Sequence, residues 1–147
     1  MKEMNKATKK IFGQALKSSP YAQYQLHIYF SNKYQTAKNA KREFFWLKKS
    51  AAHGYVPSMF WLAEELAEHP NELHKRDIKK AIKLMRKAAD ADFFVVKYRL
   101  KYYLWLEEQM IKSKCSESDF VPPLDELDFY EKILVIPVYR GDAINDL

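Results

Sequence analysis

Two stretches of the chain, WLKKSAAHGYVPSMFWL at residues 46–62 and LMRKAADADFFVVKYRL at residues 84–100, align at an offset of 38 residues. A partial copy lies 36 residues upstream of the first stretch, and it aligns Ala15 with Ala51 and Leu26 with Leu62. A fixed period of this length is typical of two-helix repeats that stack on one another. A coincidence between amphipathic helices is the alternative, because such helices resemble one another at any helical offset.

Apolar residues recur with the period of a helix in and around these stretches. The clearest set is Ala40, Phe44, Leu47 and Ala51. Such spacing places its members on one side of a helix. Ser19 before Pro20 suits a helix start, Gly54 a helix end and Asp77 an N-cap. The pattern predicts helices over residues 4–17, 20–31, 39–53, 56–68, 77–90 and 94–112.

Charge is divided unevenly along the 147 residues. Residues 1–114 contain 23 lysines and arginines and 11 acidic residues, whereas residues 115–147 contain 2 and 8. An acidic tail either docks on a basic body or meets a partner of its own. We therefore divide the chain into a helical repeat domain, residues 1–114, and an acidic C-terminal segment, residues 115–147, that packs on the repeats or binds a partner.

The C-terminal segment has a composition of its own. Pro122 and Pro123 precede a β-branched run at residues 133–136. We expect this run to be extended and packed on the helices, with a short strand as the alternative, although Pro137 and the lack of a second strand argue against a sheet. Only three glycines are present, which also favours helices over a turn-rich β fold. The predicted class is all-α: a short α-solenoid with an acidic, partly extended C-terminal segment.

The motifs AQYQLH at residues 22–27, WLKKSAAHG at 46–54 and RKAAD at 86–90 resemble the Sel1-like repeats, a family of TPR-like α-solenoids. The resemblance covers roughly residues 10–106. It departs from the family at the glycine of the first helix, where this chain has His27, Ala63 and Lys101. Sel1-like proteins act as adaptors and scaffolds, and bacterial members include small inhibitors of secreted toxic effectors. The resemblance therefore implies a protein-protein interaction module, either an adaptor or a cognate immunity protein.

The resemblance also implies where a partner would bind. In such solenoids the first helices of successive units line a concave groove, which positions two before and two after each aligned leucine should face. The partner-binding stripe predicted in this way is Tyr24, Ile28, Phe60, Glu64, Tyr98, Tyr102 and Trp105. Tyrosine and tryptophan often anchor protein interfaces, although burial in the core is the alternative for Tyr24, Phe60 and Tyr98.

The stripe could hold a partner segment or the chain's own tail. In the second case, the apolar residues Phe120, Leu124, Phe129 and Ile133 would fill the groove. The acidic residues Asp125, Glu126 and Asp128 would then meet basic residues of the body. Alanine at Tyr102 and Trp105 is expected to abolish partner binding without unfolding the chain.

Motifs for catalysis or cofactor binding are missing from the sequence. It has no phosphate loop, dinucleotide fingerprint or nucleophile elbow, its four histidines are scattered, and Cys115 is its only cysteine. We expect no enzymatic activity, no cofactor and no metal, and a cytoplasmic location, because neither a signal peptide nor a membrane span is visible. The expected partner is another protein, with an acidic protein and a toxic effector as candidates.

Nucleic-acid binding is the alternative function, because basic residues cluster along the helical body. A solvated helix face explains these clusters more simply, since acidic residues are interspersed. The sequence sets no oligomeric state.

Overall fold

The computed structural model describes residues 5–33, 35–91 and 94–138, and these form an all-helical chain. The helices are α1 (Lys6–Leu16), α2 (Pro20–Ser31), α3 (Ala37–Ala52), α4 (Val56–Glu68), α5 (Ile78–Asp90) and α6 (Phe94–Ser113), then the single turn α7 (Glu126–Asp128), which continues into the π-helix η1 (Phe129–Ile133). The six predicted helices are all present, with ends within two residues of those expected. The expected first residue, Met4, lies outside the described residues. The all-α prediction is confirmed.

Capping residues set the helix boundaries. The Ser19 side chain accepts a hydrogen bond from the Ala22 amide at 3.3 Å, and Pro20 opens α2. Gly54 follows α3 with a φ of +91°, in the left-handed region that glycine adopts most readily. Asp77 accepts a hydrogen bond from the Lys80 amide at 3.1 Å and starts α5. The sequence signals at Ser19, Gly54 and Asp77 therefore act as expected.

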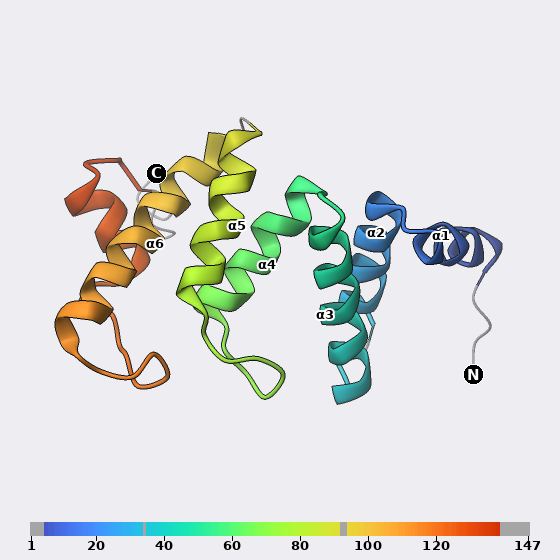
Figure 1. Cartoon of the computed structure of the whole chain (residues 1–147), viewed down its shortest axis with the longest axis horizontal. Helices are drawn as coiled ribbons and strands as arrows, with labels where there is room; N and C mark the ends of the chain where they lie inside the picture. The colour runs from blue at the N-terminus through green and yellow to red at the C-terminus, as the bar shows by residue number, and fades with distance from the viewer. Residues whose placement is uncertain (1–4, 34, 92–93, 139–147) are drawn as a thin grey trace, which may run out of the picture.

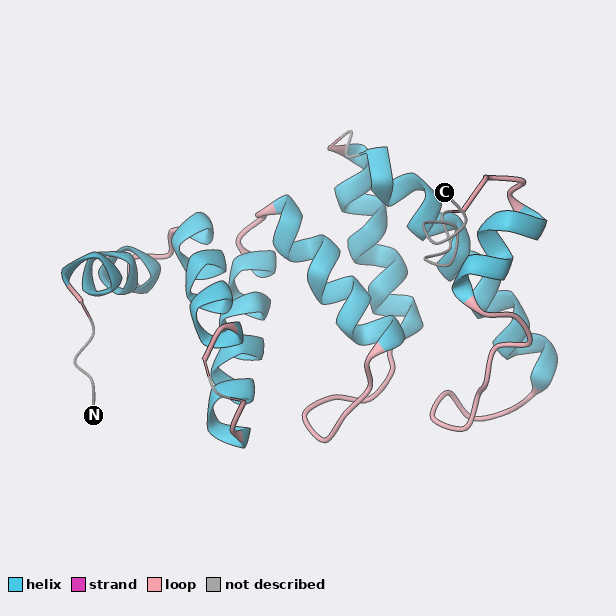
Figure 2. Cartoon of the chain, turned by 180° about the vertical axis from the view of Figure 1, so that it is seen from behind, coloured by secondary structure: helices cyan, strands magenta, loops and turns pink. Residues whose placement is uncertain are grey.

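Helices α1 to α6 form a single row along the longest axis of the molecule (Figure 1). Each packs mainly against its neighbours in the chain, from the α1–α2 pair through to the α5–α6 pair. Seen from behind, the row keeps the long connections at residues 69–77 and 114–125 on one edge (Figure 2). Nearest-neighbour packing of this kind supports the repeat prediction. A regular superhelix stays a prediction.

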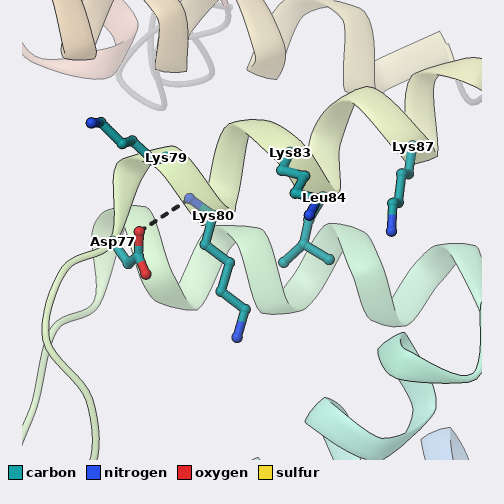
Figure 3. Close-up of a pocket in the computed structure, with 6 residues that line it drawn as sticks. All are labelled: Asp77, Lys79, Lys80, Lys83, Leu84 and Lys87. Carbon is teal, nitrogen blue, oxygen red and sulfur yellow. Dashed lines mark hydrogen bonds between the residues drawn. The ribbon is translucent and has the colours of Figure 1, made fainter.

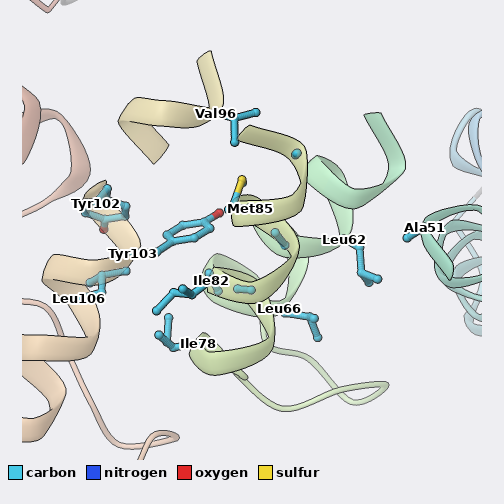
Figure 4. Packing of buried hydrophobic residues seen from close by; sticks show 14 of the residues in the cluster. Ala51, Leu62, Leu66, Ile78, Ile82, Met85, Val96, Tyr102, Tyr103 and Leu106 are labelled. Carbon is cyan, nitrogen blue, oxygen red and sulfur yellow. The ribbon is translucent and has the colours of Figure 1, made fainter. Parts of the chain in front are cut away.

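The core consists of two successive clusters, and α3 contributes to both. Trp46 packs with Ala15, Leu26 and Phe30 of α1 and α2. Its neighbour Leu47 belongs to the larger cluster, to which α4, α5 and α6 contribute. Figure 4 shows Tyr103 of α6 pointing toward Met85 of α5, while Leu62 of α4 lies on the side of Ala51. Each large apolar side chain buried in this way contributes about 1.5–3 kcal/mol to stability.

Burial recurs at equivalent repeat positions that face the core. Ala22, Ser58 and Val96 follow one another at offsets of 36 and 38 residues, and all three are buried. Leu26 and Leu62 are also buried, whereas their equivalent Leu100 is half-buried. Burial that repeats with the period of the sequence is a further argument for repeated hairpins.

The C-terminal segment folds back onto the helices. Its residues 115–125 cross the start of α5, where Glu117 Oε1 accepts a hydrogen bond from the Ile78 amide at 2.7 Å. The Arg76 guanidinium donates to the Phe120 carbonyl at 3.0 Å. Phe120 and Phe129 are buried in the same cluster as α4 to α6. We call residues 115–138, the described part of this segment, the tail; residues 139–147 lie outside the described part of the chain.

The β-branched run is not a strand, and of its apolar residues Leu134 is partly buried against the larger core cluster. Ile133 is the last residue of η1 and is 52% exposed, and residues 134–138 form no regular structure. Among the described residues, β pairing is limited to one isolated bridge between Asn71 and His74. The expectation that Ile133 packs on the helices is wrong, because it is exposed, whereas Phe120 and Phe129, which were expected to pack there with it, are buried in the larger core cluster.

Candidate functional site

A buried arginine joins α4, α6 and the tail. Arg99 of α6 is only 6% exposed, and its Nε and Nη2 atoms donate to the two carboxylate oxygens of Glu64 at 2.5 and 2.7 Å. Its Nη1 atom forms an ion pair with Glu126 and donates to the Tyr130 hydroxyl at 3.1 Å. A fork-to-fork arginine–carboxylate pair is strong and geometrically specific. Arg99 thereby anchors the tail to the two helices beneath it.

An aromatic surface lies beside this arginine. The ring of Phe129 lies 5.3 Å from that of Tyr102 and 5.0 Å from that of Trp105, measured between ring centres. Arg99 stacks over Tyr102 at 5.1 Å. Phe129 is 2% exposed, so the surface covers its ring almost completely. We call Glu64, Arg99, Tyr102 and Trp105 the tail seat.

Three carboxylates share the one guanidinium of Arg99. Besides Glu64 and Glu126, Glu68 lies 3.7 Å from its Nη2 atom. Burial raises the pKa of Glu68 and of Glu126 above the ordinary range, and neighbouring carboxylates add to the effect while Arg99 opposes it. Burial also raises the pKa of the Tyr130 hydroxyl to about 12. The tyrosine is therefore neutral at neutral pH and accepts the hydrogen bond from Arg99.

The tail seat has an equivalent one repeat earlier. Glu64 corresponds to Ile28 at an offset of 36 residues, and Arg99 corresponds to Trp61 at an offset of 38. Ile28 of α2 is 39% exposed and Trp61 of α4 is 47% exposed. The tail seat contains an ion pair that the tail covers. The equivalent positions one repeat earlier therefore carry exposed apolar side chains.

Two tyrosines extend this apolar surface along α2. Tyr21 and Tyr24 fall on the same side of the helix as Ile28, because they precede it by seven and four residues. Their rings lie 5.8 and 5.1 Å from the ring of Tyr55, between ring centres. We call Tyr21, Tyr24, Ile28 and Trp61 the open face.

The structure distributes the predicted stripe over three environments. Glu64, Tyr102 and Trp105 come together in the tail seat, and Ile28 and Tyr24 belong to the open face. Phe60 and Tyr98 are half-buried, and Phe60 packs against the larger core cluster. Tyr102 is 2% exposed and belongs to that cluster, so the expectation that alanine there spares the fold no longer holds.

Arg99 and Trp61 are the important residues that the sequence analysis missed. Arg99 stands in a largely apolar and aromatic helix sequence, YRLKYYLWL, between Tyr98 and Leu100. A charge in such surroundings is buried only when it is paired, which is the signal that could have identified it. Trp61 could have been found from the repeat alignment, which matches it with Arg99.

A separate basic surface lies on α5. An open depression of about 490 Å³ is lined by Asp77, Lys79, Lys80, Lys83, Leu84 and Lys87 (Figure 3). The four lysines are exposed, and none forms an ion pair with another described residue. Such a surface attracts anions, but as point charges in solvent its lysines hold no fixed geometry.

No protein-family model matches this chain. Comparisons with curated proteins and with solved structures find no match either. The resemblance to Sel1-like repeats therefore stays a prediction. No helix in the described part of the chain is both long enough and apolar enough to cross a membrane. Within the same residues, no three His, Cys, Asp or Glu side chains are grouped as metal ligands.

Proposed function

We propose that this protein is a protein-protein interaction module that binds a helical segment of another protein along the open face. The observation that carries the proposal is the occupied tail seat. At the equivalent positions of the next repeat, the chain already binds a helical segment of its own, α7–η1. Docking of an amphipathic helix into an apolar groove is a common mode of peptide recognition. The open face presents exposed apolar and aromatic side chains at the equivalent repeat positions, without an occupant from the described chain.

The composition of the open face suits this role. Tyrosine and tryptophan supply large, rigid contact areas and are enriched among the residues that dominate binding energy. Trp61 and Ile28 are exposed although the chain has a well-formed core. Covering them with a partner's apolar side chains would gain roughly 1.5–3 kcal/mol for each.

The finer parts of the proposal rest on the resemblance to Sel1-like repeats. They are a non-enzymatic role as a cytoplasmic adaptor or as a cognate inhibitor of a toxic effector. The basic body favours a partner that is acidic around the segment that docks. Fold-level analogy alone does not separate the two roles.

Nucleic-acid binding is the second candidate, and the unpaired lysines on α5 favour it. Single-stranded nucleic acids are usually held by basic residues together with aromatic rings on which bases stack. None of the residues that line the α5 depression is aromatic. Protein binding is therefore the better supported function. Association with DNA or RNA that weakens steeply as salt rises would reverse this order.

Affinity measurements on matched variants test the proposal. The partner is isolated by affinity purification, identified by mass spectrometry, expressed separately and titrated by calorimetry. Trp61→Ala should weaken binding by about 30-fold or more, which corresponds to about 2 kcal/mol at an interface hot spot.

Phe45→Ala is the control, because Phe45 is also 47% exposed but lies on α3. It should change the affinity by less than about twofold. Equal losses in the two variants, or no loss in Trp61→Ala, would contradict the proposal.

A further inference from the structure

We propose that the tail is an intramolecular ligand, and that the tail seat exchanges it for a partner helix with a carboxylate three residues before an aromatic pair. Glu126, Phe129 and Tyr130 present this motif in the tail itself. The inference goes beyond the proposed function, because it concerns the tail seat and not the open face, and it names the chemistry of the segment that the seat would bind.

A short motif makes most of the contacts between α7–η1 and the seat. Glu126 pairs with Arg99, Phe129 packs on Tyr102 and Trp105, and the Tyr130 hydroxyl accepts from Arg99. The surrounding apolar residues Val121, Leu127, Ile133 and Val135 are exposed. Recognition is thus concentrated in three side chains on one helical turn, which another helix could supply.

The seat can lose the tail without leaving a buried charge unpaired. Arg99 keeps both hydrogen bonds to Glu64, at 2.5 and 2.7 Å, and a third to the Tyr103 hydroxyl at 3.4 Å. Departure of the tail also removes Glu126 from a cluster in which three carboxylates share one guanidinium. A buried pair that stays intact avoids the penalty of 3–5 kcal/mol typical of stranding one charge.

The empty seat would favour a replacement of the same kind. Without Phe129, the rings of Tyr102 and Trp105 would lose the aromatic contact that covers them. An aromatic side chain restores this contact, and a carboxylate restores the second ion pair of Arg99. A helix with a lysine at the position of Glu126 would face Arg99 with a like charge and would be rejected.

If exchange occurs, the tail competes with the partner helix for the seat. This competition sets the apparent affinity of the seat for the partner. If the tail covers the seat for 99% of the time, the apparent affinity for a partner segment falls about 100-fold. Weakening the tail should then reveal binding that the intact chain suppresses. This dependence separates an intramolecular ligand from a permanent part of the core.

A peptide titration tests the inference on the full-length chain. The probe is a fluorescent peptide with the sequence of residues 123–136, PLDELDFYEKILVI, and its binding is followed by anisotropy. The Phe129→Ala/Tyr130→Ala chain should bind it at least tenfold more tightly than the unmodified chain does. A peptide with alanine at the positions of Phe129 and Tyr130 should not bind either chain.

A second, milder variant keeps the test valid if the double variant does not fold. Glu126→Gln keeps both rings and removes one ion pair, so its peptide affinity should lie between those of the other two chains, with an unchanged circular dichroism spectrum. Equal peptide affinities for the folded Glu126→Gln chain and the unmodified chain, or no binding to any folded variant, would overturn the inference.

The peptide titration and the affinity measurements on the open face give separate results. Partner binding through the open face is read from Trp61→Ala and Phe45→Ala, neither of which belongs to the tail seat. If only the peptide result is negative, the tail is a fixed part of the fold and the proposed function remains. If only the Trp61 result is negative, the proposed function fails although the seat still exchanges its ligand.

Discussion

At the scale of single residues, the structure depends most on Arg99. Its side chain is the one cation in contact with Glu64, Glu126 and the Tyr130 hydroxyl among the described residues. Buried charges are tolerated only when paired and hydrogen-bonded, and Arg99 meets both conditions on three elements at once. Its removal should therefore affect α4, α6 and the tail together.

Arg99→Met should lower the free energy of unfolding by about 3–5 kcal/mol, because it leaves buried carboxylates without their cation. Urea denaturation measures this change. Arg99→Met/Glu64→Leu should recover part of the loss, since it removes both charges of the closest pair. An Arg99→Met chain as stable as the unmodified chain would show that the arginine is solvated in solution.

Glu68 makes the stability depend on pH. Burial and the carboxylates of Glu64 and Glu126 raise its pKa in the folded state, against the opposing effect of Arg99 and Arg76. A carboxyl group that holds its proton more tightly when folded destabilises the fold at any pH at which it is ionised. This penalty is complete above the folded pKa and disappears as pH falls through the folded pKa to the unfolded value of about 4.3.

Glu68→Gln should therefore stabilise the protein at pH 7, by a few tenths to about 1 kcal/mol. Its advantage over the unmodified chain should shrink as pH falls and vanish near pH 4. Thermal unfolding of both chains between pH 4 and 7 gives the comparison. A variant that is less stable at pH 7 would mean that the attraction between Glu68 and Arg99 dominates.

At the scale of helices, capping signals in the sequence predicted the elements well. Ser19, Gly54 and Asp77 mark real boundaries because the side-chain caps and the left-handed glycine are local features, which act within one turn. The tail was harder to predict. Its β-branched run favoured an extended conformation, but Phe129 is fixed by contacts with Tyr102 and Trp105, which are distant in sequence.

The start of α5 illustrates the same difference. Asp77 is a local cap that the sequence shows, whereas Glu117 reaches the Ile78 amide from 39 residues further along the chain. Glu117→Ala should lower stability by about 0.5–2 kcal/mol, the usual range for a helix cap. Hydrogen exchange should accelerate at the first turn of α5 before it does at the centre of the helix. Unchanged exchange there would indicate that water replaces the carboxylate without loss.

At the scale of the whole molecule, equivalent repeat positions along the row of helices carry different side chains. The repeat alignment located the stripe on α2, α4 and α6, because a period in sequence becomes a period in space. It could not show that the tail covers the α6 end, since that depends on how residues 126–130 fold back. The stripe was predicted from positions two before and two after each aligned leucine. This rule missed Trp61, which lies one residue after the predicted position Phe60.

The proposed function requires a partner helix to lie on the open face, beside Trp61. Photo-crosslinking tests it most directly, with p-benzoylphenylalanine placed at position 61 in one chain and at position 45 in another, each irradiated in complex with the purified partner. An efficient cross-link should form from position 61 to a helical segment of the partner, and none should form from position 45. Cross-linking from position 45 alone, or equally from both positions, would contradict the proposed function.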